Sequence, residues 1–305
     1  MSGISSGASR LLVVGDVIDD IVAIPAGPIL PDTDAHAAIL RSPGGSGANT
    51  AAWLGFSGCA VDFVGAVGPD GLEAHSRALR NAGVTPHLVV VPTAPTGTIV
   101  IVVDGEQRTM LTERGANAML RSVDVSDELL ASAAVLYVSG YSVTGAFGAA
   151  GAVELMARAH RVGVRVALGS GSTGFLRELG VETFRSVFPT VDLFLVNHSE
   201  GELLTGRTDP GEIVTELLGE LPVVALTLGG GGALIGARGV TAVAVPVEAA
   251  ELRDPTGAGD AFAAGFLSVW ARSEDLQEAG RVGVALAARA VAQPGARPPV
   301  DDVPR

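Results

Sequence analysis

The sequence predicts an α/β fold in which a mostly parallel central sheet is covered by helices on both faces. From residue 125 onward, short apolar strands alternate with longer amphipathic segments, as expected for parallel strands joined by crossover helices. Two earlier stretches, at about 17–43 and 94–112, are extended and two-sided without a helical period. We expect them to form a small β lid beside a site; an edge extension of the main sheet is the alternative.

The elements of the first half are separated by glycine-rich turns. In order, we predict a buried strand at 10–16, a helix at 48–58, a strand at 61–67, a helix at 72–82 and a β run at 98–103. Asp104-Gly105 is a tight-turn signal, so 108–111 is expected to pair back on that run as a hairpin.

The second half supplies most of the predicted sheet. Strands are expected at 135–138, 164–168, 193–196 and 223–228, and a β pair at 233–235 and 242–245. Helices are expected at 147–161, 175–179, 181–187, 199–205, 210–219, 259–271 and 275–292. We therefore predict one domain over residues 10–300, with flexible tails at 1–9 and 301–305 and a Pro-rich terminal tail beginning at Pro294.

Composition narrows the classes of function. The chain has 305 residues and a net charge of -13, which argues against nucleic acid and anionic membranes as partners. All 20 basic residues are arginine, which excludes a standard Walker A loop, a protein kinase site and Schiff-base chemistry. No signal peptide or membrane span is predicted. Because Cys59 is the only cysteine, we expect no internal disulfide and a cytoplasmic location.

The segment from Asp254 to Asp260 carries the strongest chemical signal. Its two carboxylates bracket a Gly-rich turn, and an apolar helical run follows at once. Such a turn directs backbone N–H groups and the positive end of a helix dipole at one point, which favours an anion such as phosphate. Asp260 beside that point is a candidate general base for a hydroxyl, and its low reference pKa predicts that it is ionised at pH 7. A purely structural turn is the alternative.

A second motif gives this turn a partner. Gly44-Gly45-Ser46-Gly47-Ala48-Asn49-Thr50-Ala51 precedes it by about 205 residues. With intermediate elements at 65–70, 197–200 and 227–232, the chain from about residue 10 to 300 resembles the PfkB, or ribokinase-like, carbohydrate and nucleoside kinases. The resemblance implies a ribokinase-like fold and transfer of the γ-phosphoryl group of ATP to a hydroxyl of a small sugar, with Mg²⁺ as cofactor.

The resemblance also assigns roles on the phosphate side. Asp260 matches the catalytic base, and the backbone N–H groups of Gly257, Ala258 and Gly259 match the anion hole. Asp254 and Thr256 match ligands of a monovalent cation in related kinases, for which K⁺ is the candidate, and whose other ligands come from a loop here near 293–297.

On the nucleotide side, Asn197 and Glu200 match an Asn-x-x-Glu element that suits water-mediated Mg²⁺ ligation; helix N-cap pairing is the alternative. Thr227, Gly229 and Gly232 match the loop that lies against the nucleotide.

On the acceptor side, the resemblance assigns the sugar to the carboxylate of Asp20, with Gly44, Gly45 and Asn49 lining the same pocket. Helix capping is the alternative for Asn49, and the roles of Asp16 and Asp19 stay open. Arg108 and Arg114 flank the predicted lid hairpin, and we expect them at the surface rather than on an acidic substrate. The chain departs from the family at Ser46, where lysine is frequent, and at 169–172, where many relatives carry aspartate.

Rival functions follow from the same residues. A nucleoside kinase would need an apolar wall, which Phe56, Phe147 or Tyr141 would supply. A non-catalytic sugar-binding protein on this fold would not need Asp260. A dinucleotide-binding oxidoreductase is disfavoured because Gly15 is not followed by a G-x-G-x-x-G pattern. An exposed lid edge also predicts a homodimer.

Overall fold

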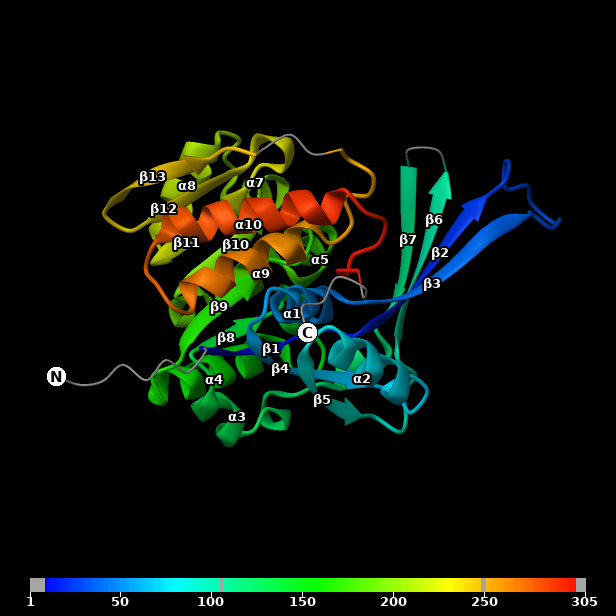
Figure 1. The fold of residues 1–305 in the computed structure, drawn as a ribbon, viewed down its shortest axis with the longest axis horizontal. Helices are drawn as coiled ribbons and strands as arrows, with labels where there is room; N and C mark the ends of the chain where they lie inside the picture. Colours follow the sequence, from blue (N-terminus) through cyan, green and yellow to red (C-terminus); the bar gives the residue numbers. More distant parts are fainter. Residues whose placement is uncertain (1–8, 105–106, 248–250, 300–305) are drawn as a thin grey trace.

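The computed structural model of the chain describes residues 9–104, 107–247 and 251–299. Its core is a nine-stranded sheet in the order β13-β12-β11-β10-β9-β8-β1-β4-β5 (Figure 1). The strands from β11 to β5 in this order are parallel, whereas β12 and β13 are antiparallel to their neighbours. Their bounds are β1 (Arg10–Val14), β4 (Ala60–Val67), β5 (Val84–Val90), β8 (Val135–Val138), β9 (Arg165–Gly169), β10 (Leu193–Asn197), β11 (Val223–Thr227), β12 (Ala233–Ala237) and β13 (Val240–Val245).

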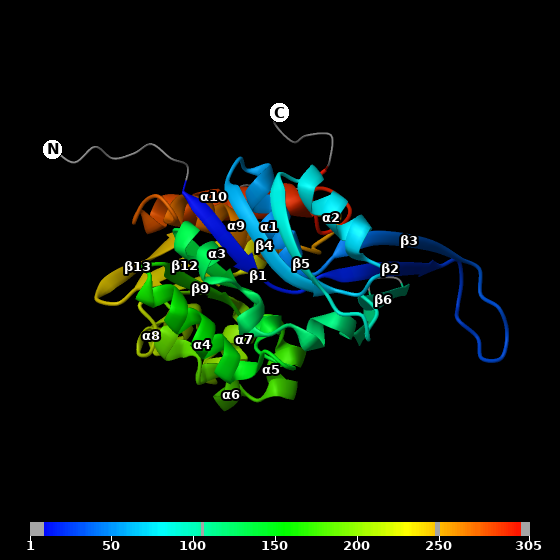
Figure 2. The ribbon, with the colours of Figure 1, turned by 90° about the horizontal axis from the view of Figure 1, so that it is seen from below.

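Helices cover both faces of this sheet (Figure 2). One face carries α1 (Ser46–Phe56), α2 (Leu72–Asn81), α9 (Ala258–Trp270) and α10 (Leu276–Val291). The other carries α3 (Asp127–Ser132), α4 (Gly148–Arg161), α5 (Thr173–Leu179), α6 (Val181–Arg185), α7 (His198–Thr205) and α8 (Pro210–Leu218). Alternate residues of β1 point to the two faces of the sheet. Leu11 and Val13 belong to the apolar core on one face, and Leu12 and Val14 belong to the core on the other. This confirms the predicted fold class.

Five short 3-10 helices complete the connections. They are η1 (Gly115–Met119), η2 (Ser122–Asp124), η3 (Gly140–Ser142), η4 (Phe188–Thr190) and η5 (Gly229–Gly231) among the described residues. No helix in the described part of the chain is both long enough and apolar enough to cross a membrane.

A second sheet projects from the core (Figure 1). It contains β2 (Ile18–Pro25), β3 (Ala37–Gly44), β6 (Gly97–Asp104) and β7 (Gln107–Glu113), in the order β3-β2-β6-β7. None of its described strands pairs with the nine-stranded sheet, so the alternative of an edge extension is wrong and the lid is a separate layer. The tip of the predicted hairpin, after Asp104, lies outside the described residues. The homodimer expected from an exposed lid edge stays a prediction.

Besides the 3-10 helices, one strand and one α-helix were not predicted from the sequence. Strand β5 contains Pro86, which cannot donate to a ladder, and it is tolerated because β5 is the last strand of the sheet. Helix α3 has only 6 residues, and its start depends on Ser126, whose side chain accepts a hydrogen bond from the backbone N–H of Leu129. Both elements are too short or too interrupted for hydrophobic periodicity to show them.

The C-terminal segment corrects another expectation. Residues 294–299 are not a tail, because they pack back on α1 and on the turn before α9. The indole Nε1–H of Trp53 donates to the carbonyl of Ala296 at 2.9 Å, and the N–H of Gly295 donates to Asp254 Oδ2 at 3.0 Å. The tails predicted at 1–9 and 301–305 lie outside the described residues, apart from residue 9.

Candidate active site

Three cavities follow one another between the lid and α10. The glycine-loop cavity, of about 350 Å³, lies between η5, α9 and α10. It shares Thr227, Gly259 and Phe262 with a middle cavity of about 90 Å³. The middle cavity in turn shares Ser46 and Asp260 with the lid cavity, of about 490 Å³, beneath the β lid. Asp260 therefore stands at the junction between the middle cavity and the lid cavity.

Asp260 lies in the first turn of α9 and accepts two side-chain hydrogen bonds. Ser46 Oγ donates to its Oδ1 at 2.6 Å, and Asn49 Nδ2 donates to its Oδ2 at 3.0 Å. Burial raises the pKa of Asp260 to about 7, although the two hydrogen bonds act in the opposite direction. The low reference pKa used to expect an ionised Asp260 at pH 7 thus does not apply to the buried carboxyl group, whose pKa lies close to that pH.

The two donors come from the first turn of α1, which begins after Gly45. Gly45 has a φ of 93°, a conformation that side chains disfavour, and this brings Ser46 and Asn49 to the same side of the helix start. The alternative of Asn49 as a helix cap is wrong, since no side chain caps α1. Sequence reasoning noted Ser46 only as a departure from the family; its contact with Asp260 depends on packing of α1 against α9.

Arg297 is a site residue that sequence reasoning missed. Its Nε donates to Asn49 Oδ1 at 3.1 Å, and its Nη2 donates to the carbonyl of Gly44 at 2.9 Å. The first bond fixes the orientation of the Asn49 amide, so that the NH₂ group is left to donate to Asp260. Burial lowers the pKa of Arg297 to about 10, against the attraction of nearby carboxylates led by Asp20, so the guanidinium is charged at neutral pH. No local pattern distinguishes this arginine within the Pro-rich end.

Asp20 of β2 lines the lid cavity, as the acceptor assignment requires. Burial raises its pKa to about 6, and the charge of Arg297 opposes that shift. Gly45 and Asn49 line the same cavity. Gly44 lies behind Asp20 instead, where a Cβ atom would overlap the carboxylate, so this glycine makes room for Asp20.

The two neighbouring carboxylates have other contacts. Asp16 accepts hydrogen bonds from the backbone N–H groups of Ser46 and Gly47 at 2.9 and 3.0 Å, and from Ser139 Oγ at 3.0 Å. It therefore holds the start of α1 in place. Asp19 is 3.0 Å from His75 Nε2 and does not line the lid cavity.

The turn before α9 has the geometry expected of an anion site. Gly257 is the N-cap, with φ 78°, and Gly259 has no atom within 4 Å of the place where a Cβ would stand. The N–H of Ala258 makes only a long bond, at 3.3 Å, to the carbonyl of Pro255. Asp254 Oδ1 accepts hydrogen bonds from the backbone N–H and the hydroxyl of Thr256, at 2.9 and 2.6 Å. Asp254 therefore ties this turn to the C-terminal loop at Gly295.

Asn197 and Glu200 form a reciprocal cap at the start of α7. Asn197 Oδ1 accepts from the N–H of Glu200 at 2.9 Å, and Glu200 Oε2 accepts from the N–H of Asn197 at 3.1 Å and from the Ser170 hydroxyl. The alternative of N-cap pairing is thus correct, yet both residues also line the middle cavity. Burial raises the pKa of Glu200, so a cation in that cavity would favour its charged form.

The nucleotide-loop residues divide between two cavities. Thr227 lines both the glycine-loop and the middle cavity, whereas Gly229 and Gly232 line only the glycine-loop cavity. Within the described ranges, no three His, Cys, Asp or Glu side chains form a cluster suited to a metal ion.

An aromatic and arginine wall closes the far side of the lid cavity. The rings of Tyr141 and Phe175 lie 5.2 Å apart, and the guanidinium of Arg114 lies 5.3 Å from the Phe175 ring and donates to the Tyr141 carbonyl at 3.0 Å. The surface position expected for Arg114 is therefore wrong. Phe56 and Phe147 are buried in the two apolar cores and line none of the three cavities. Phe175 was missed, and the side chain of Arg108 lies outside the described residues.

Comparison with known proteins places the chain among sugar and nucleoside kinases. The model of the pfkB family of carbohydrate kinases matches residues 8–303, which include both motifs and all three cavities. Adenosine kinase of Dictyostelium discoideum is 25% identical over 281 residues, covering 85% of this chain and 82% of the relative. 1-Phosphofructokinase of Rhodobacter capsulatus is 28% identical over 294 residues, covering 92% and 90%. The solved structure of adenosine kinase from Sinorhizobium meliloti has a TM-score of 0.86 at 26% identity and covers 96% of each chain.

Proposed function

The chain belongs to the pfkB family of carbohydrate kinases, and we propose that it transfers the γ-phosphoryl group of ATP to a hydroxyl of a small sugar. The observation that carries this proposal is the position of Asp260 between the middle cavity and the lid cavity. Nucleotide in the first two cavities and acceptor in the third would meet at this carboxylate. The family's phosphotransferase activity needs a base between nucleotide and acceptor, and Asp260 lies at that position.

In the proposed reaction, Asp260 takes the proton of the acceptor hydroxyl as that oxygen attacks the γ-phosphorus. Ser46 and Asn49 hold the two carboxylate oxygens, so the base has one orientation. Asp20 supplies a second carboxylate in the lid cavity, which accepts hydrogen bonds from other hydroxyls of the sugar. The acceptor is thereby fixed at two points, and its reactive oxygen is directed to the middle cavity.

In the proposed reaction, backbone N–H groups rather than a lysine stabilise the negative charge of the transferred phosphoryl group. The N–H groups of Gly257, Ala258 and Gly259 stand at the start of α9, where the helix dipole favours an anion. Gly259 leaves room for phosphate to approach this backbone closely. Thr227, Gly229 and Gly232 would lie along the nucleotide in the glycine-loop cavity.

Two cations complete the proposal. Asn197 and Glu200 are the residues that would hold Mg²⁺ through water, and the buried carboxylate of Glu200 in a phosphate-sized cavity fits that role. Mg²⁺ bound there would neutralise part of the phosphate charge. Asp254 and Thr256 remain the proposed ligands of a monovalent cation. Replacing Na⁺ by K⁺ in the assay should raise kcat, and an unchanged kcat would count against this second cation.

A second candidate acceptor, a nucleoside, is favoured by the far wall of the lid cavity. Tyr141 and Phe175 offer flat apolar surface there, and the lid adds Ile99 and Met110. A free pentose leaves this wall without a partner, whereas the base of a nucleoside would pack on it. In this case Phe175→Ala should lower kcat/KM for nucleosides at least about tenfold and leave free sugars nearly unchanged. Equal losses for both acceptor classes would exclude base packing at Phe175.

The proposed reaction is tested by ADP release with pentoses, hexoses, keto-deoxy acids and nucleosides. We expect acceptor-dependent ADP release with at least one sugar or nucleoside. Asp260→Asn should lower kcat by about 10²–10⁴-fold and leave the Kd of ATP unchanged, because only proton transfer is removed. Absence of any acceptor-dependent release would refute the proposed function, and equal losses of binding and turnover would refute the role of Asp260.

A further inference from the structure

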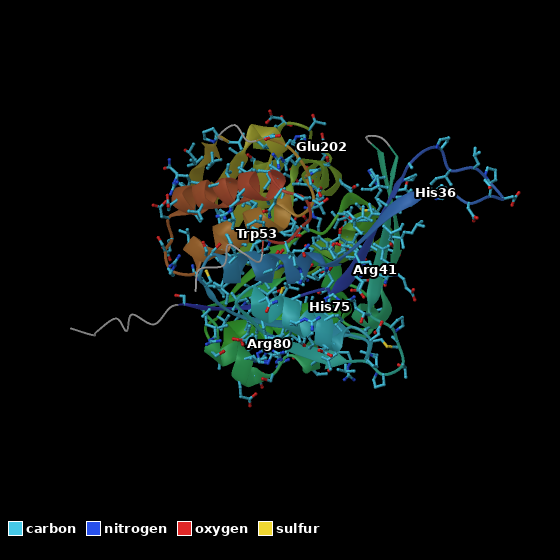
Figure 3. The ribbon with its side chains drawn as sticks, turned by 45° about the vertical axis from the view of Figure 1, so that its right-hand side comes forward. His36, Arg41, Trp53, His75, Arg80 and Glu202 are labelled. Carbon is cyan, nitrogen blue, oxygen red and sulfur yellow. The ribbon has the colours of Figure 1, made fainter. Side chains whose placement is uncertain are left out.

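A fourth cavity lies on the opposite side of the lid from the proposed acceptor. It has a volume of about 500 Å³ and is enclosed by β3, α2 and the C-terminal loop. None of its lining residues also lines the three cavities of the candidate active site. Figure 3 shows this side of the molecule, with Arg41 of β3 and His75 of α2 beside each other. We call it the arginine cavity.

Strand alternation explains why the lid serves two cavities. Successive side chains of β2 point to opposite faces, so Asp20 lines the lid cavity and Asp19 the arginine cavity. Ile21 and Arg41 are directly paired across β2 and β3, as are Asp19 and Pro43, so Arg41 shares the face of Asp19. The arginine cavity is thus formed by the outer face of the lid.

Three arginines from separate segments line this cavity. Arg41 comes from the lid, Arg77 from α2 and Arg297 from the C-terminal loop. Among the described residues, Arg41 makes no ion pair, and Arg77 has only a 3.6 Å contact with Glu73 while its side chain is 67% exposed. The one carboxylate in the lining, Asp19, is hydrogen-bonded to His75. In a chain with a net charge of -13, the lining thus has three arginines and one aspartate, although Arg297 also interacts with Asp20 and Asp260.

Two nitrogen atoms of lining residues are buried and leave hydrogen-bonding capacity unused. Arg297 Nη1 and His75 Nδ1 have no hydrogen-bond partner among the described residues. Arg297 uses its Nε and one N–H of Nη2 on Asn49 and Gly44, so Nη1 is the guanidinium nitrogen without a partner in the described residues.

Apart from the polar residues Ser42 and Asn81, the rest of the lining is apolar. Its apolar part includes small aliphatic side chains and proline rings: Pro43, Ala52, Ala74, Ala78, Ala82 and Pro298. A floor of this kind favours an apolar body, whereas the arginines favour a carboxylate or phosphate.

From this arrangement we infer that the arginine cavity binds a small organic anion, a carboxylate or phosphate monoester carried on an apolar body. Arginine suits both head groups because its planar N–H donors match their oxygen atoms. The ligand would contact the lid through Arg41 and the core through Arg77. Its lining residues line none of the three cavities of the candidate active site, although Arg297 also holds Asn49 there, and the inference does not depend on the proposed kinase function.

Trp53 provides a direct reporter of occupancy. Its indole donates to the carbonyl of Ala296, which lines the arginine cavity next to Arg297. Trp270, the other tryptophan, packs on Arg165 and contributes a background. The whole protein is titrated with phenyl phosphate, benzoate and inorganic phosphate, and the tryptophan emission is recorded. The first two probes distinguish the head groups, and inorganic phosphate lacks the apolar body.

We expect a saturable change with phenyl phosphate or benzoate and at least about tenfold weaker binding of inorganic phosphate. The doubly substituted Arg41→Gln, Arg77→Gln protein should bind the better probe at least about tenfold more weakly, since two charge-assisted bonds are removed. Arg80→Gln is the matched control, because Arg80 lies on α2 and is exposed but does not line the cavity (Figure 3).

Unchanged affinity in the double variant would place the probe elsewhere and overturn the inference. An equal loss in Arg80→Gln, equal binding of inorganic phosphate, or no saturable change would also overturn it. Each single variant changes an exposed side chain, so either one can replace the double variant if that protein does not fold. Melting temperatures of all variants establish that the proteins compared are folded.

Discussion

The titration of Asp260 gives the most specific prediction, because it sets the pH dependence of turnover. Burial raises the pKa of this carboxyl to about 7. A group with that pKa is about 9% ionised at pH 6 and about 91% ionised at pH 8. If only the ionised form accepts the proton, kcat should rise about tenfold between these pH values. An exposed aspartate would give no change over this range.

Ser46→Ala shifts this profile in a direction that the geometry fixes. The Ser46 hydroxyl donates to Asp260 Oδ1 at 2.6 Å and so favours the ionised form. Hydrogen bonds to charged groups contribute about 1.5–3 kcal/mol, which corresponds to about one to two pKa units. Removing this donor should therefore move the midpoint of the acidic limb from about 7 to about 8–9. Ser46→Thr, which retains a hydroxyl, should keep the original midpoint.

The assay is ADP formation in a single turnover from pH 5.5 to pH 9.5, with the protein in excess over ATP and the acceptor saturating. A single turnover excludes product release, which limits kcat in many enzymes. An acidic limb near pH 4 would show that burial does not raise the pKa of Asp260 as inferred. A limb at the same pH in Ser46→Ala and in the unmodified protein would refute the contribution of the Ser46 hydrogen bond.

Three further predictions concern stability and acceptor binding. Asp260→Asn should raise the melting temperature at pH 8. The pKa of this carboxyl is raised in the folded state, so its ionisation lowers the stability of the protein as pH increases from about 4 to about 7. A lower melting temperature of the variant in scanning calorimetry would contradict this. Gly257→Ala should lower the melting temperature by several degrees, because φ of Gly257 is 78° and the new Cβ meets Ala296. Gly259→Ala places its Cβ in open space, so it should lower kcat without changing the melting temperature. A larger loss of stability in Gly259→Ala than in Gly257→Ala would exclude this explanation. Asp20→Asn should raise KM for the acceptor at least about tenfold, while Asp19→Asn should leave this KM unchanged. If steady-state kinetics gives the same KM change in both variants, Asp20 is not part of the proposed acceptor site.

Local sequence predicted the two segments that carry the chemistry but not all of their contacts. The Gly-rich turn before α9 pointed to Asp260, but a structural turn stayed an alternative until the resemblance of both motifs to the family assigned Asp260 and Asn49. Ser46 was visible only as a departure from the family pattern, because its hydrogen bond spans 214 positions. Phe175 was missed for a related reason: its place on the lid cavity depends on how α5 packs against the loop after β8.

Arg297 shows most clearly what the sequence could not predict. It lies in a segment whose prolines and glycine suggest a loose end, yet its side chain is inserted between Gly44 and Asn49. The capping role of Asn197 and Glu200 was an open alternative, since the same Asn-x-x-Glu spacing serves both a helix cap and a magnesium site. Spacing alone cannot separate those roles, and in the folded chain the pair both caps α7 and lines the middle cavity.

The chain contains no lysine, and at position 297 arginine has a physical advantage over lysine. Burial lowers the pKa of Arg297 to about 10, which still leaves the side chain charged at neutral pH. A lysine begins from a reference pKa of about 10.4, so the same burial would bring its pKa towards neutral. The positive charge beside Asp20 and Asp260 would then vary with pH in the range where those carboxyls titrate. With arginine, that charge is constant while Asp260 gains and loses its proton, and the Nε–H bond to Asn49 holds the amide in one orientation throughout.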